Sequence, residues 1–170
     1  MNSTNKHKNI MIVALLLVLF MMVLVQGCGN PNTAPAGSTI TVHQNASTWD
    51  SGGAGLGAGN TIPFDFTVVV TYPSSTMPMP FADITISGAY AAPNTSCPGG
   101  FLGGLGCYQF YGSLFFAGST DTRNSPFTAR TDRDGKYVFG ALMTGPTPTF
   151  RDSVYIQSGS NVGFGTIELK

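Results

Sequence analysis

A segment of alternating residues, from Ile62 to Tyr72, is the feature of this sequence that most constrains its fold. Successive side chains of an extended strand point to opposite faces, so a two-residue period of large apolar residues predicts a strand with one buried face. No segment after residue 28 has the 3.6-residue period of an amphipathic helix, and we therefore expect an all-β domain. The face predicted to be buried carries Phe64, Phe66, Val68 and Val70.

Short extended segments separated by turns fill the rest of the chain after residue 38. Glycine (22) and proline (11) are abundant, and both favour turns. Residues 45–60 and 97–107 are predicted to be loops, and Asp132-Arg-Asp-Gly135 is predicted to form the turn of a β-hairpin. A total of about seven or eight short strands is typical of a β-sandwich. Besides 62–72, we predict strands at 39–43, 81–87, 108–116, 127–131, 136–139, 152–157 and 162–169.

The later predicted strands resemble a known family. The runs TDRDGKYVFGAL (131–142) and RDSVYIQSGSNVGFGTIEL (151–169) are similar to the last strands of bacterial immunoglobulin-like domains. Residues 64–88 look like their strand–turn–strand unit with a proline-bearing turn. The resemblance covers residues 62–169 and implies an immunoglobulin-like antiparallel sandwich. A transthyretin-like sandwich, whose repeats share a G-x-Y-x-F signature, is the alternative fold.

The N-terminus has a different character. Basic residues at 6–8 precede an unbroken apolar run at 10–25, and Gly27 stands directly before Cys28. The run of about 16 residues is shorter than the roughly 20 that span a bilayer, and basic residues ahead of it favour an export signal. This order of features resembles the signal peptide and lipobox of bacterial lipoproteins. The resemblance implies cleavage before Cys28 and attachment of lipid to its sulfur; an uncleaved membrane helix is the alternative.

These expectations divide the chain into three parts. Residues 1–27 would be a cleaved signal helix, residues 28–38 a lipidated cysteine with a flexible tether, and residues 39–170 the sandwich domain. The membrane would be a partner through the lipid on Cys28, and the protein would reside in the cell envelope. Gly29, in place of Asp after the lipidated cysteine, is associated by this resemblance with sorting to the outer membrane in a cell with two membranes.

The two remaining cysteines, Cys97 and Cys107, are expected to form a disulfide. An exported protein meets an oxidising environment, and lipidation of Cys28 would leave an even number of thiols. Closing the glycine-rich segment 98–106 would stabilise the fold by about 2.5–3 kcal/mol. Two thiols without a nearby histidine make a poor zinc site.

Composition and motifs give no reason to expect an enzyme, a cofactor or a nucleic-acid partner. Removal of Lys6 and Lys8 with the signal would leave a net charge of about −2, which does not favour nucleic acid. His43 would be the only histidine of the mature chain. A lone histidine at the head of a strand is more often a surface residue than a general base.

Asp132 and Asp134 are candidate ligands for a calcium ion. Together with Asp121 or Asp152 they offer carboxylates of the kind that Ca²⁺ prefers. The alternative is a tight turn, in which Asp-Gly accepts left-handed backbone angles. We expect the turn, because a full calcium loop supplies more carboxylates at set positions.

Aromatic and aliphatic residues near the second predicted loop suggest a binding site. Any of them left exposed would form an apolar patch suited to a protein or glycan partner. We therefore expect a non-enzymatic envelope module for adhesion, scaffolding or assembly, with a protein partner. A carbohydrate-binding or transport-linked accessory domain of transthyretin-like fold is the alternative, and a hydrolase with an unrecognised site is a weaker one. The predicted patch consists of Trp49, Phe101, Leu102, Leu105, Tyr108 and Tyr111.

Overall fold

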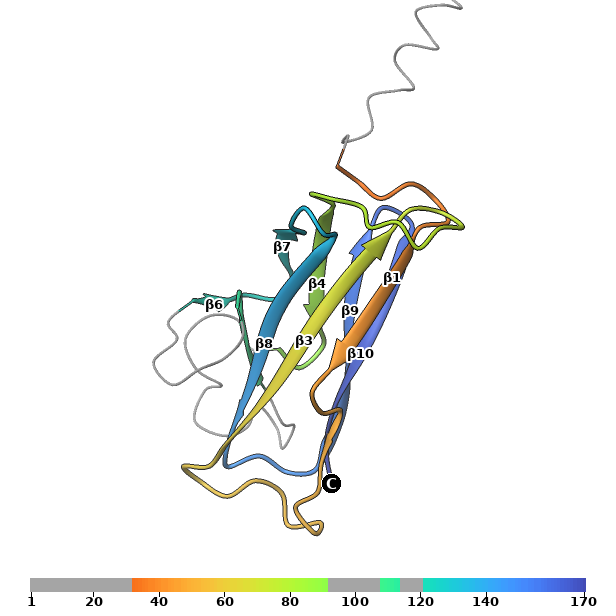
Figure 1. Cartoon of the computed structure of the whole chain (residues 1–170). Coiled ribbons are helices and arrows are strands. Elements are labelled where there is room, and N and C mark those ends of the chain that lie inside the picture. Colours follow the sequence, from red (N-terminus) through yellow and green to blue (C-terminus); the bar gives the residue numbers. More distant parts are fainter. Residues whose placement is uncertain (1–31, 92–107, 114–120) are drawn as a thin grey trace, which may run out of the picture. The chain divides into compact units, whose positions relative to one another are not determined.

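Two five-stranded sheets face each other across one core in the computed structural model, which describes residues 32–91, 108–113 and 121–170 (Figure 1). Sheet A contains, in spatial order, β1 (Thr39–Gln44), β3 (Thr61–Thr71), β8 (Lys136–Thr144), β5 (Tyr108–Tyr111) and β6 (Thr122–Arg123). Sheet B contains β2 (Thr48–Trp49), β10 (Asn161–Leu169), β9 (Phe150–Ser158), β4 (Asp83–Gly88) and β7 (Phe127–Arg130).

The strand order is immunoglobulin-like, which confirms the predicted fold class. The order β1-β3-β8-β5 corresponds to strands A-B-E-D of the immunoglobulin sandwich, and β10-β9-β4 corresponds to G-F-C. Neighbouring strands pair antiparallel, except that the short β2 lies parallel to the end of β10. One departure is that β7, beside β4, follows β5 in the chain instead of preceding it.

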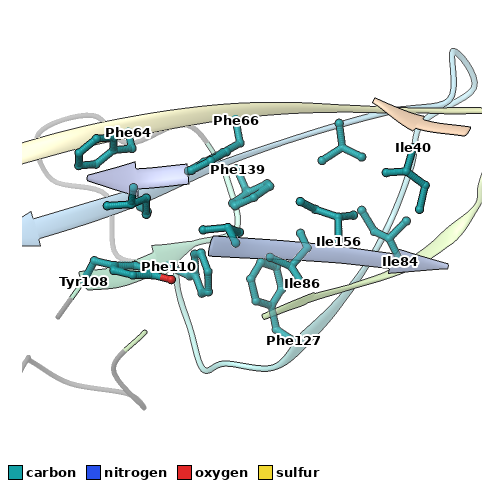
Figure 2. Close-up of a cluster of buried hydrophobic side chains, with 14 of the residues drawn as sticks. Ile40, Phe64, Phe66, Ile84, Ile86, Tyr108, Phe110, Phe127, Phe139 and Ile156 are labelled. Carbon is teal, nitrogen blue, oxygen red and sulfur yellow. The ribbon is translucent and has the colours of Figure 1, made fainter. Parts of the chain in front are cut away.

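The alternation of β3 fills the centre of the core, as predicted. The four side chains predicted to face inward are fully buried, Ile62 on the same face is 3% exposed, and Ile84 and Ile86 of β4 meet this face from sheet B. The Phe66 ring stacks on that of Phe139 with 4.7 Å between centroids, and Phe110 meets Phe139 edge-on at 5.8 Å. Figure 2 shows this aromatic layer between the two sheets.

The turn at Asp132–Gly135 does not close a hairpin, so that prediction was wrong. The strand before it, β7, pairs with β4 in sheet B, while the strand after it, β8, pairs with β3 and β5 in sheet A. The turn therefore leads the chain from one sheet to the other. Asp-Gly specifies a tight reversal locally, but the partner of each flanking strand depends on the whole sandwich.

The last two strands, β9 and β10, do form a hairpin around Gly159 and Ser160. At the edge of this hairpin the two sheets come close together. The side-chain amide of Gln44 on β1 donates to the carbonyl oxygen of Thr166 (2.7 Å) and accepts from its N–H (2.9 Å). A side chain thus supplies the edge pairing that a neighbouring strand would otherwise give.

Residues 32–38, which belong to the predicted tether, lie against the domain, so the prediction of a flexible tether does not hold for them. The Asn161 side chain donates to the carbonyl oxygens of Ala34 (3.1 Å) and Pro35 (2.8 Å) and accepts from Gly37 N–H (3.0 Å). Ala34 N–H also donates to the Ser158 hydroxyl at 3.0 Å. The folded unit therefore begins at Asn32.

Several predicted features lie outside the described residues: the signal segment 1–27, Cys28, and the Cys97–Cys107 pair. In the part of the chain that the structure describes, there is no helix with the length and apolar character needed to cross a membrane.

Candidate functional site

The predicted aromatic patch does not assemble on the surface. Tyr108 is fully buried and Tyr111 is 8% exposed, so neither can meet a partner, and this part of the prediction was wrong. The Tyr108 hydroxyl donates to Asp152 Oδ2 at 2.7 Å. Burial is the larger cause, and this interaction the smaller one, of a raised pKa of Tyr108. Both sides of β5 are covered, so period-two alternation could not separate a buried face from an exposed one.

The other members of the predicted patch are not brought together with these tyrosines. Phe101, Leu102 and Leu105 lie outside the described residues. Trp49 is half exposed and ends the short strand β2, where its carbonyl oxygen accepts from Lys170 N–H (2.9 Å). It therefore lies beside the C-terminus, at the end of the domain where Figure 1 places the last residue.

A different apolar patch is exposed on the outer face of sheet B. It consists of Tyr155 on β9 and of Val162 and Phe164 on β10, and we refer to it as the β9–β10 patch. Phe164 is 67% exposed, Val162 is 55% exposed and Tyr155 is 49% exposed. Single exposed apolar residues are ordinary, but three neighbours on one regular sheet face are typical of an interaction surface.

Two glycines explain why these large side chains point outward. On β10 the residues that alternate with Val162 and Phe164 are Gly163 and Gly165, which face inward. A Cβ on Gly163 would lie 2.6 Å from the backbone oxygen of Ile40, and one on Gly165 would lie 2.8 Å from the Phe66 ring. The inner side of β10 has no room for side chains there, so the strand register leaves Val162 and Phe164 outside.

Phe164 and Tyr155 are directly opposite each other on the two antiparallel strands. The N–H of Thr166 on β10 points to Gln44 and away from β9. Phe164 is two residues earlier on the same strand, so its backbone N–H and carbonyl also point away from β9. The Phe164–Tyr155 pair is therefore a non-hydrogen-bonded pair, in which the Cα atoms are about 4.5 Å apart and the side chains are close. Both side chains therefore extend from neighbouring positions on the outer face of sheet B.

A polar rim borders the β9–β10 patch on the side of β9 and β4 and along the last part of β10. The register shows that these polar side chains, on β4, β9 and β10, point to the same outer face of sheet B as the patch. An apolar centre with a polar rim is the usual anatomy of a protein–protein interface. The rim contains Thr85, Ser87, Arg151, Ser153, Gln157, Thr166 and Glu168.

The carboxylates considered for calcium have other roles. Asp132 Oδ1 accepts from the N–H groups of Asp134 (2.8 Å) and Lys136 (2.9 Å), which fixes the turn between β7 and β8. Asp121 pairs with Arg123 at 2.8 Å, and Asp152 binds Tyr108 in the core. Among the described residues, no group of three or more His, Cys, Asp or Glu side chains is placed to hold a metal ion. The two hydrogen bonds to Asp132 support the predicted turn.

His43 lies on the outer face of sheet A, exposed and opposite Thr67 of β3. The prediction of a surface histidine agrees with this exposure, although His43 lies near the end of β1 and not at its head.

Comparisons with known proteins give the following. No protein-family model matches the chain, and no curated protein matches it in sequence. Among solved structures, the Yersinia pseudotuberculosis adhesin InvE is similar, with 16% identity over 81% of this chain and a TM-score of 0.47. The chain spans about a third (33%) of that adhesin chain. The PapD-like domain 7 of human CEP192 is similar at 11% identity over 84% of this chain and 91% of that domain, with a TM-score of 0.37.

At these identities, and with TM-scores below 0.5, the similarities say nothing about what this chain binds. The immunoglobulin-like assignment stands on the strand order of the two sheets, and the binding surface on the exposure of the β9–β10 patch.

Proposed function

We propose that this chain is a non-enzymatic binding module of the cell envelope that recognises a protein partner through the outer face of sheet B. The observation that supports this most is the outward pair of Phe164 and Tyr155, flanked by Val162 and bordered by polar side chains of β4, β9 and β10. Aromatic residues at the centre of a patch supply most of the free energy of protein association, and surrounding polar groups exclude water.

The proposed partner is a protein because of the shape and chemistry of this surface. The outer face of a β-sheet is broad and presents side chains in regular rows, which suits another folded surface better than a small molecule. The rim is nearly balanced in charge, with Arg151 opposite Glu168 on the neighbouring strand. Long-range electrostatic attraction therefore contributes little, and apolar contact at the centre would determine affinity.

The envelope location of this proposal rests on the lipoprotein resemblance of residues 1–28. Lipidation at Cys28 would place two or three acyl chains in the membrane, and each buried methylene contributes about 0.8 kcal/mol. We expect Cys28→Ser to abolish the membrane-bound form of the protein, measured by fractionation and by mass spectrometry of the N-terminal peptide. Membrane partitioning that is unchanged in Cys28→Ser would contradict the anchor and leave the binding surface untouched.

A photo-crosslinking amino acid at position 164 tests the binding surface in cells that make the full chain. The matched control carries the same amino acid at position 41, on the outer face of sheet A, where Thr41 is exposed. We expect a discrete protein adduct from position 164 that is absent from position 41. Equal labelling from both positions would contradict a dedicated surface on sheet B.

Carbohydrate binding is a second candidate, because Trp49 is half exposed and its indole ring offers a face on which a sugar can stack. Binding of envelope glycans that is lost in Trp49→Ala and retained in Phe164→Ser would favour this candidate over a protein partner.

A further inference from the structure

The loop between β3 and β4, residues 73–81, forms a second exposed apolar surface. It has no charged residue, and its sequence is PSSTMPMPF. Met77 is 63% exposed and Phe81 is 50% exposed, although the core is close by and buries Met79 from the same loop. The loop thus divides its large side chains between the core and the outside.

The exposed side chains are held by a fixed backbone. Tyr72 N–H donates to the carbonyl oxygen of Met77 (3.0 Å), and Met79 N–H donates to that of Val70 (2.8 Å). Phe81 has φ of 56°, in the left-handed region that residues with a Cβ seldom adopt, and its N–H donates to the Asp132 carbonyl oxygen at 3.1 Å. A strained backbone that keeps an aromatic ring half exposed is the kind of outlier that accompanies function.

This loop lies at the end of the domain where the chain enters it. The carbonyl oxygen of Asn32 accepts from Asp83 N–H at 2.8 Å, just after the loop, and a Cβ on Gly37 would lie 3.6 Å from Pro73 Cβ, at its start. Figure 1 shows the entering segment and the loop at one end of the sandwich, and the C-terminus at the other.

The chain between Cys28 and this end is short. Because residues 32–38 are docked, only four residue steps separate Cys28 from the folded unit, and they span at most about 14 Å. The headgroup layer of a bilayer is about 5–8 Å thick on each side. A lipid on Cys28 would therefore hold the domain with the Asn32 end next to the membrane surface.

We propose that the loop 73–81 inserts Met77 and Phe81 into the interfacial region of the lipid bilayer and so orients the domain. The proposal rests on the lipid anchor at Cys28 proposed above. Apolar and aromatic side chains without charges suit the boundary between headgroups and acyl chains. The turn beside the loop exposes Arg133 and Lys136 together with Asp132 and Asp134, so its charges balance, and the apolar side chains of the loop would provide the attraction to the membrane.

In this orientation the long axes of the strands stand away from the membrane, and Trp49 is at the distant end. Since Trp49 is the one tryptophan of the sequence, it serves as a built-in reference. The β9–β10 patch would face sideways from the domain, where a neighbouring envelope protein can reach it.

Tryptophan quenching by lipid tests the orientation. The lipidated full-length protein, matured in cells, is reconstituted into vesicles of phosphatidylcholine with brominated acyl chains. The variants are Phe81→Trp and Met77→Trp, each combined with Trp49→Phe; Phe164→Trp in the same background is the control on the side of the domain. We expect a loss and blue shift of fluorescence for positions 81 and 77, and unquenched fluorescence for position 164 and for Trp49 of the wild-type protein.

The two proposals fail in different ways. If the wild-type protein carries no lipid on Cys28 and does not float with the vesicles, the anchor and the orientation are both overturned. If it floats and the tryptophans at positions 77 and 81 are quenched no more than that at position 164, only the orientation is overturned. Should the Phe81→Trp variant fail to fold, Met77→Trp on its own decides the outcome, because Met77 makes no strained backbone turn.

Discussion

Two aromatic regions of this domain have similar compositions and opposite environments. Strand β5 places Tyr108 and Phe110 in the core, whereas the β9–β10 patch presents Tyr155 and Phe164 to solvent. Phe110 contacts the rings of Tyr108, Phe127 and Phe139, with centroid distances from 5.2 to 5.8 Å. Phe164 lies opposite Tyr155 on a sheet face that the rest of the described domain leaves open.

The contrast shows that the packing of neighbouring strands, more than the aromatic residues themselves, decides which rings are structural. Opposite β5 there is space between the sheets for large rings. Opposite the inner side of β10, Ile40 and Phe66 approach so closely that only glycine fits. The first set of rings stabilises the fold, and the second is available to bind.

Among the substitutions that test this contrast, Phe110→Ala should change the free energy of unfolding most. Removal of a fully buried ring should lower the free energy of unfolding by about 3–5 kcal/mol, through lost burial and an unfilled cavity. Chemical denaturation measures this change. A loss below about 1 kcal/mol, as expected of a surface position, would contradict the buried assignment of β5.

A smaller loss is expected from Gly163→Ala. The added Cβ would meet the Ile40 backbone oxygen at 2.6 Å, and such overpacking costs about 1–3 kcal/mol. The control is Thr166→Ala, on the outer side of the same strand, for which we expect a change within about 0.5 kcal/mol. If Gly163→Ala is as stable as wild type, steric exclusion does not explain why Phe164 points outward.

Alkaline pH should lower the stability of the domain through its buried tyrosines. Burial first, and then Asp152, raise the pKa of Tyr108, and burial also raises the pKa of Tyr111. Folding therefore favours the protonated phenol: its stabilisation is complete below the unfolded pKa of about 10 and is lost as pH rises above that value. For Tyr108 the slope should approach about 1.4 kcal/mol per pH unit above that value.

Denaturation midpoints between about pH 8 and pH 11 measure this slope, which Tyr108→Phe should reduce. An identical pH profile for wild type and Tyr108→Phe would contradict the role assigned to the buried phenol.

The smallest effect on stability is expected from Phe164→Ser. A ring that is 67% exposed contributes little to the core, so the free energy of unfolding should change by no more than about 0.5 kcal/mol. Thermal denaturation measured beside Phe110→Ala gives the direct contrast. A loss of several kcal/mol for Phe164→Ser would mean that the ring is structural and would remove the basis of the binding surface.

The sequence was sufficient to predict the all-β class, the inward face of β3 and the last two strands, because these depend on local alternation and turn chemistry. It was insufficient for β5, where both faces are covered and aromatic residues occupy both. It also failed for the turn at Asp132–Gly135, since the two flanking strands find their partners in different sheets.

The β9–β10 patch was missed for a related reason. In the segment Val162-Gly-Phe-Gly165, hydrophobicity alone favours burial of valine and phenylalanine. The glycines are the signal that could have indicated the opposite, because two glycines on one face of a strand often mark the close approach of another backbone. That approach, by β1, becomes evident only once the two sheets are placed together.

The most direct test of the central claim is the affinity of the purified domain for the protein captured from position 164. The dissociation constants of wild type, Phe164→Ser and the sheet A control Thr41→Ser would be compared. We predict that Phe164→Ser weakens binding at least about tenfold, as expected of a central aromatic residue, while Thr41→Ser binds like wild type. Equal affinity of all three proteins would contradict recognition through the outer face of sheet B.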